Sequence, residues 1–76
     1  MKKQNLPIDN RIRELREKSD SMTQQELADL VGVTRHTIMA IEAAKYSPSL
    51  EVAFRISAVF HQPLEQVFQF QPDSKN

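Results

Sequence analysis

The sequence predicts a small all-α domain of five short helices, and three observations support this fold class. Apolar residues recur at intervals of three and four, which is typical of amphipathic helices. Segments rich in Ser and Pro, together with the single glycine, Gly32, interrupt this pattern. The 76 residues are enough for one domain but not for two. We expect an N-terminal arm over residues 1–9, a helical domain over 10–70 and a flexible tail over 71–76.

The first helix is predicted over residues 10–18, because Ile12 and Leu15 lie on one face at helical spacing. A Ser-Asp-Ser segment at 19–21 then ends this helix. Met22 is expected to pack back against the core.

A second helix is predicted to begin near Gln24, because Thr23 and Glu26 have the spacing of a capping box. Its apolar residues share one face at helical spacing: Leu27, Ala28 and Val31. Gly32 follows, and a lone glycine at this point indicates a tight turn that requires a positive φ angle.

A third helix follows this turn, with Thr34 as its predicted N-cap and Ile38 and Ile41 on its buried face. Two short helices joined by a glycine-centred turn form the outline of a helix-turn-helix motif. The motif needs a small residue where the helices cross, and we expect Ala28 to fill that role. Val33 is expected to hold the turn against the core. The exposed face of the third helix is then free to enter a DNA major groove.

A Ser-Pro-Ser segment at 47–49 breaks the chain again and precedes a fourth helix. Its inner residues repeat at intervals of three and four: Leu50, Ala53, Ile56, Ser57 and Phe60. Pro63 is expected at the first position of a short fifth helix, where its missing N–H costs nothing. Residues 68–71 alternate between apolar and polar as a strand does, and they could pair with residues 6–8 as a small ribbon.

The composition excludes several functional classes. The absence of cysteine excludes disulfides and thiolate metal sites, and the two histidines are far apart, so we expect no metal and no cofactor. No nucleophile–base pair or carboxylate pair has a workable spacing, so the sequence does not predict an enzyme. No apolar stretch approaches the roughly 20 residues of a membrane span, and no hydrophobic segment follows the basic N-terminus. We therefore expect a cytoplasmic protein that does not bind membranes.

The charges cancel overall but are unevenly distributed. Ten basic and ten acidic side chains give a formal net charge of zero. Residues 1–18 and 33–48 are net positive, whereas residues 19–32 carry acidic side chains only. Charge alone favours ordinary solvated helix faces, so the motif and not the charge indicates a nucleic-acid partner.

Over about residues 10–70 the sequence resembles the Cro/C1-type, phage-repressor-like helix-turn-helix regulators. The resemblance lies in Asn10-Arg11-Ile12-Arg13-Glu14-Leu15-Arg16-Glu17, Thr23-Gln24-Gln25-Glu26-Leu27-Ala28, Gly32-Val33-Thr34-Arg35, Ile38 with Ile41-Glu42, Lys45-Tyr46-Ser47-Pro48-Ser49-Leu50, Val59-Phe60 and Leu64-Glu65-Gln66-Val67-Phe68. It implies five helices and sequence-specific binding to double-stranded DNA, normally by a symmetric dimer.

The resemblance also implies roles for individual residues. Contacts to DNA bases are expected from Thr34, Arg35, His36, Thr37, Met39 and Ala40. Contacts to phosphates are expected from Arg13, Thr23, Gln24, Lys45, Tyr46 and Ser47. Arg35 is the first choice for a base contact, because a guanidinium can bind guanine through two hydrogen bonds. Arg35 and His36 could instead be ordinary surface residues, and Tyr46 could pack on its own loop.

The family often pairs an arginine late in the first helix with a glutamate late in the third, and Arg16 and Glu42 stand at these positions. The resemblance therefore implies a structural ion pair. The sequence departs from the family in the residues that follow, where Ala43 and Ala44 replace a frequent Asn-Gly. An alanine at positive φ costs about 1 kcal/mol. Leu30 also departs from the pattern, since it stands where a polar residue is usual.

The aromatic residues suggest how the chain assembles, because four of them lie in its last third: Phe54, Phe60, Phe68 and Phe70. Phe60 and Phe68 fit the core register, whereas Phe54 and Phe70 exceed what so small a core can cover. We expect a two-fold homodimer with Phe54, Leu64, Phe68 and Phe70 in its interface. The alternative is that the extra aromatics fold back on their own domain. A two-fold dimer predicts an inverted-repeat operator with half-sites roughly 34 Å apart.

The sequence is consistent with two functions. The first is a transcriptional regulator, expected to be a repressor, that inserts the helix at about residues 34–43 into the major groove. The alternative is an antitoxin-like or adaptor protein whose aromatic C-terminal face binds an unknown protein partner. Salt-sensitive, sequence-selective DNA binding separates the two.

Overall fold

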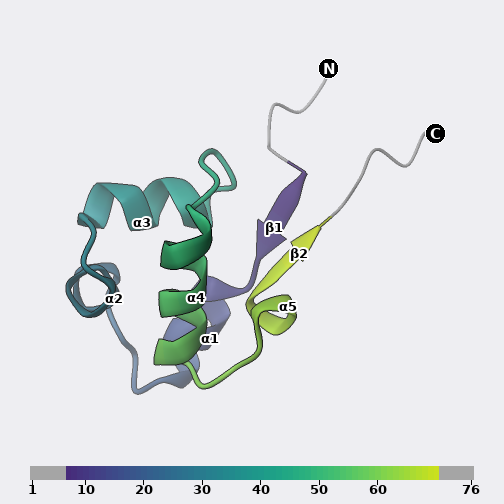
Figure 1. The fold of residues 1–76 in the computed structure, drawn as a ribbon. Helices are drawn as coiled ribbons and strands as arrows, with labels where there is room; N and C mark the ends of the chain where they lie inside the picture. Colours follow the sequence, from purple (N-terminus) through teal and green to yellow (C-terminus); the bar gives the residue numbers. More distant parts are fainter. Residues whose placement is uncertain (1–6, 71–76) are drawn as a thin grey trace.

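The computed structural model of the protein describes residues 7–70, which form five helices and a two-stranded ribbon (Figure 1). In chain order the elements are β1 (Ile8–Asn10), α1 (Ile12–Lys18), α2 (Gln24–Val31), α3 (Arg35–Glu42), α4 (Leu50–Val59), α5 (Leu64–Val67) and β2 (Phe68–Phe70). The prediction of five helices with a terminal ribbon is confirmed. The expected outer parts of the arm and the tail, residues 1–6 and 71–76, lie outside the described residues.

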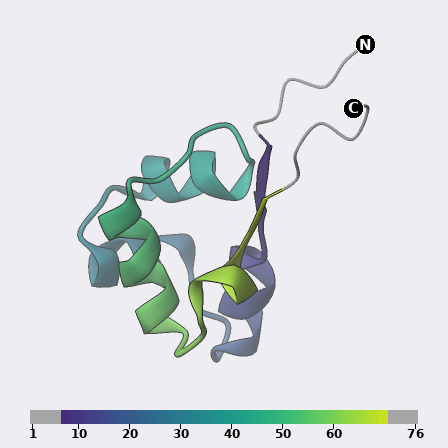
Figure 2. The same cartoon turned by 45° about the vertical axis from the view of Figure 1, so that its right-hand side comes forward.

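The ribbon joins the two ends of the domain. Its strands are antiparallel, with Ile8 opposite Phe70 and Asn10 opposite Phe68, so β1 and β2 lie side by side in both ribbon views (Figures 1 and 2). The prediction placed the first strand at residues 6–8, which is wrong by two residues. Pro7 explains the shift, because proline has no N–H to donate to a neighbouring strand.

Helix α1 begins two residues later than predicted. Asn10 pairs with Phe68 in the ribbon, so it cannot be the first residue of the helix. Its side chain nevertheless contacts the helix, since Asn10 Oδ1 accepts a hydrogen bond from the N–H of Ile12 at 3.1 Å. Beyond α1, the chain turns without glycine, through positive φ angles of 58° at Asp20 and 55° at Ser21.

The segment from α2 to α3 follows the prediction closely. Thr23 and Glu26 form the capping box, and Thr34 Oγ1 accepts a hydrogen bond from the N–H of Thr37 at 3.2 Å. Gly32 ends α2 with a φ angle of 88°, and its N–H donates to the carbonyl of Ala28 at 2.8 Å. A Cβ at this position would find room, so the backbone angle, and not crowding, requires the glycine.

Two details of the C-terminal helices differ from the prediction. Leu50 is not on the inner face of α4, because its side chain is 66% exposed. It is the first residue of the helix and lies beyond the edge of the core, next to its N-cap Ser49. Pro63 is the N-cap of α5 and not its first helical residue, with an extended ψ angle of 157°.

One apolar core connects all five helices. Its buried members are Ile12, Leu27, Ala28, Val31, Ile38, Ile41, Ile56, Phe60 and Val67. Each large side chain of this kind contributes about 1.5–3 kcal/mol when it is removed from water. Because α3 contributes Ile38 and Ile41 to this core, its inner face is fixed and its outer face remains at the edge of the molecule (Figure 1).

Candidate nucleic-acid interface

Helix α3 presents a polar outer face that starts at its N-terminus. Ile38 and Ile41 are at most 1% exposed, so the side chains between and before them are directed away from the core. The expected base-contact residues divide into two groups. Thr34, Arg35, His36 and Met39 are exposed, whereas Thr37 and Ala40 are half-buried. The first turn of α3 and the residues just before it are therefore the most accessible part of this surface.

The C-terminal end of α3 is held by an ion pair. Arg16 Nε lies 2.6 Å from Glu42 Oε2, and Arg16 Nη2 lies 3.1 Å from Glu42 Oε1. Arg16 Nη1 also donates to the carbonyl of Met22 at 2.8 Å. Both charged side chains are nearly buried, at 12% and 9% exposed, and the hydrogen bonds to Glu42 raise the pKa of Arg16. The pair fixes the end of α3 to α1 and to the segment before α2.

Gln24 connects the start of α2 to the same carboxylate. Its Nε2 atom donates to Glu42 Oε1 at 3.2 Å, and its side chain is half-buried. The structure thus shows that Gln24 braces α3. Every buried side-chain nitrogen and oxygen in residues 7–70 has a hydrogen-bond partner, so this network leaves no polar group unpaired.

A shallow hollow collects several of the expected DNA-contact residues between α1, the start of α2 and α3. It is lined by Arg13, Arg16, Glu17, Ser21, Met22, Thr23, Gln24, Gln25, Arg35 and Glu42. Arg13 is paired only loosely with Glu17, at 3.3 Å and with both side chains exposed, so its guanidinium is free to turn toward a ligand. The Thr23 hydroxyl is engaged in the capping box, where it accepts from the N–H of Glu26 at 3.0 Å.

Ser21 and Gln25 are polar, uncharged residues of this hollow that were not among the sequence-predicted contacts. Gln25 lies next to Gln24 in the first turn of α2, where free N–H groups attract anions, and this position was the available signal. Ser21 has a φ angle of 55°, which no sequence pattern indicates.

The remaining expected phosphate contacts lie in the loop that follows α3. Lys45, Tyr46 and Ser47 are all exposed in the loop that follows the helix. Ala44 adopts a φ angle of 60°, so the chain keeps the left-handed turn that the family usually makes with glycine. The N–H groups of Ala44 and Lys45 donate to the carbonyls of Ile41 and Ala40 at 2.9 and 3.0 Å. The loop therefore leaves α3 in a defined direction despite the alanine.

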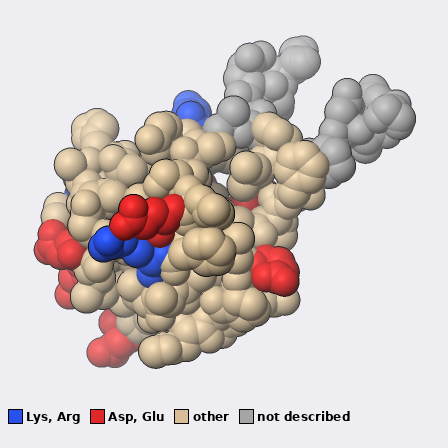
Figure 3. Space-filling view, viewed as in Figure 1, with Lys and Arg blue, Asp and Glu red and all other residues tan. Residues whose placement is uncertain are grey.

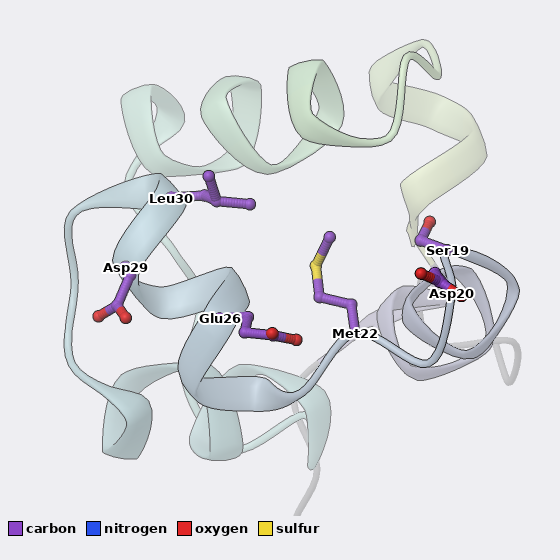
Figure 4. Close-up of a pocket in the computed structure, with 6 residues that line it drawn as sticks. All are labelled: Ser19, Asp20, Met22, Glu26, Asp29 and Leu30. Carbon is purple, nitrogen blue, oxygen red and sulfur yellow. The ribbon is translucent and has the colours of Figure 1, made fainter.

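The opposite edge of α2 is acidic. A second hollow there is lined by Ser19, Asp20, Met22, Glu26, Asp29 and Leu30, so three carboxylates and two apolar side chains share this edge (Figure 4). Leu30, the residue that departs from the family pattern, is 61% exposed. Carboxylates repel phosphates, so this edge is not part of the candidate interface.

An apolar surface lies apart from α3, on α4, α5 and the ribbon. Three of its side chains are strongly exposed: Leu50 at 66%, Phe54 at 52% and Phe70 at 68%. A shallow groove beside them is lined by Ile8, Pro48, Leu50, Ala53, Leu64 and Phe68. Of the expected interface residues, Phe54 and Phe70 are thus exposed, whereas Leu64 and Phe68 are half-buried. Ile8 and Leu50 were missed, although Leu50 stands four residues before Phe54 on α4 and this helical spacing was a signal for it.

The structure offers no other kind of site in the residues it describes. Within residues 7–70, no three His, Asp or Glu side chains are grouped closely enough to hold a metal ion. None of the helices in this part of the chain combines the length and the apolar character that crossing a membrane requires.

Comparison with known proteins agrees with this geometry. A family described as helix-turn-helix matches residues 12–67. An uncharacterized HTH-type transcriptional regulator of Archaeoglobus fulgidus is 50% identical over 60 residues, which cover 79% of this chain and 83% of that one. The HTH-type transcriptional regulator YgzD of Bacillus subtilis, also uncharacterized, is 38% identical over 65 residues, or 86% of this chain and 97% of that one.

The fold itself recurs in a solved structure. A crystal structure of a candidate DNA-binding protein from Bacteroides fragilis superposes with a TM-score of 0.69, over 82% of this chain and 98% of that one. At 22% sequence identity, this likeness shows the shared fold alone. The matched family spans α1 to α5, including both helices of the motif. The chain therefore belongs to the Cro/C1-type helix-turn-helix family of transcriptional regulators, which is not a family of enzymes.

Proposed function

We propose that this protein binds double-stranded DNA sequence-specifically, with α3 in the major groove. The observation that carries the proposal is the arrangement of α3. Its inner face is buried through Ile38 and Ile41, its last residue Glu42 is fixed by an ion pair, and Arg35 remains exposed at its start. A helix that is held on one side and polar on the other fits a groove about 12 Å wide.

Arg35 is the residue that we assign to base recognition. Its side chain is exposed and lines the same hollow as Gln24 and Arg13. A guanidinium that binds guanine through two hydrogen bonds contributes about 1–3 kcal/mol of discrimination. Further base contacts are assigned to Thr34, His36, Thr37, Met39 and Ala40.

Phosphate contacts would come from two segments next to α3. Arg13, Thr23 and Gln24 lie on one side, beside the N-terminus of α2. Lys45, Tyr46 and Ser47 lie on the other, in the loop after α3. Such contacts fix the register of the protein on the duplex and make the affinity fall with rising salt.

We assign the apolar surface to a homodimer. Leu50, Phe54 and Phe70 are too exposed to stabilise the monomer fully, and they lie on α4 and β2, away from the polar face of α3. Much of the face seen in Figure 3, which includes α4 and the ribbon, consists of residues other than Lys, Arg, Asp and Glu. The charged pair Glu51–Arg55 on α4 is an exception. With Glu51 72% and Arg55 56% exposed, it would lie at the rim of an interface.

A two-fold dimer would place two α3 helices on successive major grooves, with half-sites roughly 34 Å apart. The preferred site would then be an inverted repeat. A dimer that covers such a segment excludes other proteins from it, and this favours repression over activation. Because its partner would be operator DNA, the protein is proposed to act in the cytoplasm.

The test is selection of bound duplexes from a random library at moderate salt, with the wild type, Arg35→Ala and Lys18→Ala. The wild type is expected to enrich an inverted repeat. Arg35→Ala is expected to lose preference at one position in each half-site. Lys18→Ala is the control, because it removes a positive charge that is paired with Glu14 on α1 and lies outside the hollow.

The outcomes separate the two candidate functions. If no sequence is enriched above non-specific retention, the DNA proposal fails, and the antitoxin-like or adaptor function through the apolar surface becomes the better explanation. If Lys18→Ala changes base preference as strongly as Arg35→Ala, Arg35 has no special role in recognition.

A further inference from the structure

Asn10 connects the ribbon to the end of α3. Its Nδ2 atom donates to the carbonyl of Ile41 at 2.9 Å, across 31 positions of sequence, and this contact is partly buried. Its Oδ1 atom accepts from the N–H of Ile12 at 3.1 Å. One short side chain thus joins β1, the start of α1 and the last turn of α3.

The backbone of Asn10 is held firmly on both sides. It pairs with Phe68 in the ribbon, and the N–H of the next residue, Arg11, donates to the carbonyl of Val67 at 2.9 Å. Val67 is fully buried. Because an asparagine side chain has only two rotatable bonds, the Nδ2 atom has little freedom relative to the ribbon.

The carbonyl oxygen of Ile41, which accepts the hydrogen bond from Asn10, lies at the end of α3. The carbonyl of Ile41 accepts a second hydrogen bond, from the N–H of Ala44 at 2.9 Å. Ala44 is the residue with the left-handed backbone that directs the chain into the loop at 45–47. Asn10 therefore contacts α3 where the helix ends and the proposed phosphate-binding loop begins.

The side-chain hydrogen bonds of Glu42 connect α3 to other helices and not to the ribbon. Glu42 connects the helix to Arg16 of α1 and to Gln24 of α2. Among the hydrogen bonds of residues 7–70, the one from Asn10 is the link between α3 and the ribbon. The ribbon carries Phe70, which we place in the dimer interface.

We propose that Asn10 is a positioning residue that sets the angle of α3 relative to the dimer interface, and so sets the half-site spacing that the dimer accepts. This inference rests on the proposed DNA-binding function and on the proposed dimer. It concerns the distance between the two recognition helices and not their base preference, because Asn10 lies behind α3 and does not belong to its outer face.

The test uses Asn10→Ser, because a serine hydroxyl can still accept from the N–H of Ile12 but is too short to reach the carbonyl of Ile41. Binding is measured to inverted repeats whose spacers differ by one and two base pairs. The preference for the best spacer is expected to fall about fivefold, the factor that corresponds to one net hydrogen bond. The base preference within each half-site is expected to stay as in the wild type.

Two further variants keep the test decisive. Asn10→Asp keeps the acceptor and loses the donor, so it replaces Asn10→Ser if that variant does not fold. Gln69→Ala is the matched control, since Gln69 also lies in the ribbon but donates to Glu65 of α5 and not to α3. The control is expected to keep the wild-type spacing profile.

An unchanged spacing profile in Asn10→Ser and Asn10→Asp would overturn this inference and leave the proposed function intact. The inference would also fail if Asn10→Ser altered the base preference within a half-site, or if the wild type selected single half-sites without a fixed spacing. If the wild type selected no sequence at all, the proposed function itself would fail, which is a different result.

Discussion

The half of the molecule built from α1, α2 and α3 differs from the half built from α4, α5 and the ribbon in how its surface is completed. In the first half, Arg16, Glu42 and Gln24 are joined by hydrogen bonds among their side chains. The N-caps of α2 and α3 and the Gly32 turn have the residues that their geometry requires. In the second half, Leu50, Phe54 and Phe70 remain in solvent.

This difference indicates different tasks. A surface whose polar groups are already paired holds its shape before a ligand arrives, which suits a helix that must present side chains in register. Exposed apolar side chains that lie in one region favour association with another surface, because covering them removes apolar area from water. The first half is thus a preformed recognition surface, whereas the second half is completed only when another molecule covers it.

The largest effect is expected from Glu42→Ala. Removing this carboxylate strands the nearly buried guanidinium of Arg16 and the amide of Gln24, so unfolding free energy should fall by about 3 kcal/mol. Thermal unfolding followed by circular dichroism measures the loss. The matched control is Glu17→Ala, which breaks the exposed pair with Arg13 and should cost less than about 0.5 kcal/mol. Equal melting temperatures for the two variants would show that the buried network does not stabilise α3.

The next largest effect concerns the incomplete half. The double variant Phe54→Ser with Phe70→Ser should weaken dimerisation about 100-fold. Fully covering a phenylalanine contributes about 1.5–3 kcal/mol, and both side chains are already partly covered in their own chain, so the two together contribute about 3 kcal/mol. Sedimentation equilibrium over micromolar concentrations measures the change. Leu30→Ser is the control, since Leu30 is 61% exposed on the acidic edge of α2. A wild-type monomer at tens of micromolar, with and without DNA, would contradict the proposed interface.

A smaller effect is expected at the turn after α3. Ala44→Gly should stabilise the protein by about 1 kcal/mol, because alanine is strained at the φ angle of 60° that Ala44 adopts. Ala43 has a φ angle of −82°, so Ala43→Gly should instead destabilise the protein. Urea unfolding of both variants gives the two signs. Destabilisation by Ala44→Gly would mean that the methyl group of Ala44 has a packing role larger than the strain.

The smallest effect is expected from the surface of α1. Hydrogen bonds from Arg11 and then Lys18 lower the pKa of Glu14 to about 2. A carboxyl whose pKa is lowered by folding stabilises the protein above its unfolded pKa and loses that contribution as the pH falls. Glu14→Gln should therefore flatten the decline of stability between about pH 5 and pH 2, as measured by urea unfolding at several pH values. If the stability of this variant fell with pH as steeply as that of the wild type, the ion pairs of Glu14 with Arg11 and Lys18 would be screened by solvent.

Most of the fold was predictable because local signals decide it. The capping box at Thr23, the N-cap at Thr34 and the positive φ angle at Gly32 each follow from neighbours in sequence. The errors occurred where a distant segment decides. The sequence places Asn10 at the start of the predicted first helix, yet its pairing with Phe68 places it in the ribbon.

The candidate site was predictable in part for the same reason. Residues at helical spacing on α3 reveal which side faces outward, and the exposure of Arg35 and His36 agrees with that pattern. The contact of Asn10 with Ile41 spans 31 positions and depends on the ribbon, so no local pattern indicates it. The exposure of Leu50 likewise depends on where the core ends and not on helical spacing.

The central claim is that α3 binds DNA while the apolar half pairs copies of the chain. Titration of the isotope-labelled protein with the selected duplex, followed by backbone amide NMR, tests it most directly. We predict the largest shift changes at residues 34–40, at 23–24 and at 45–47. Changes confined to α4, α5 and the ribbon, with α3 unaffected, would contradict the account.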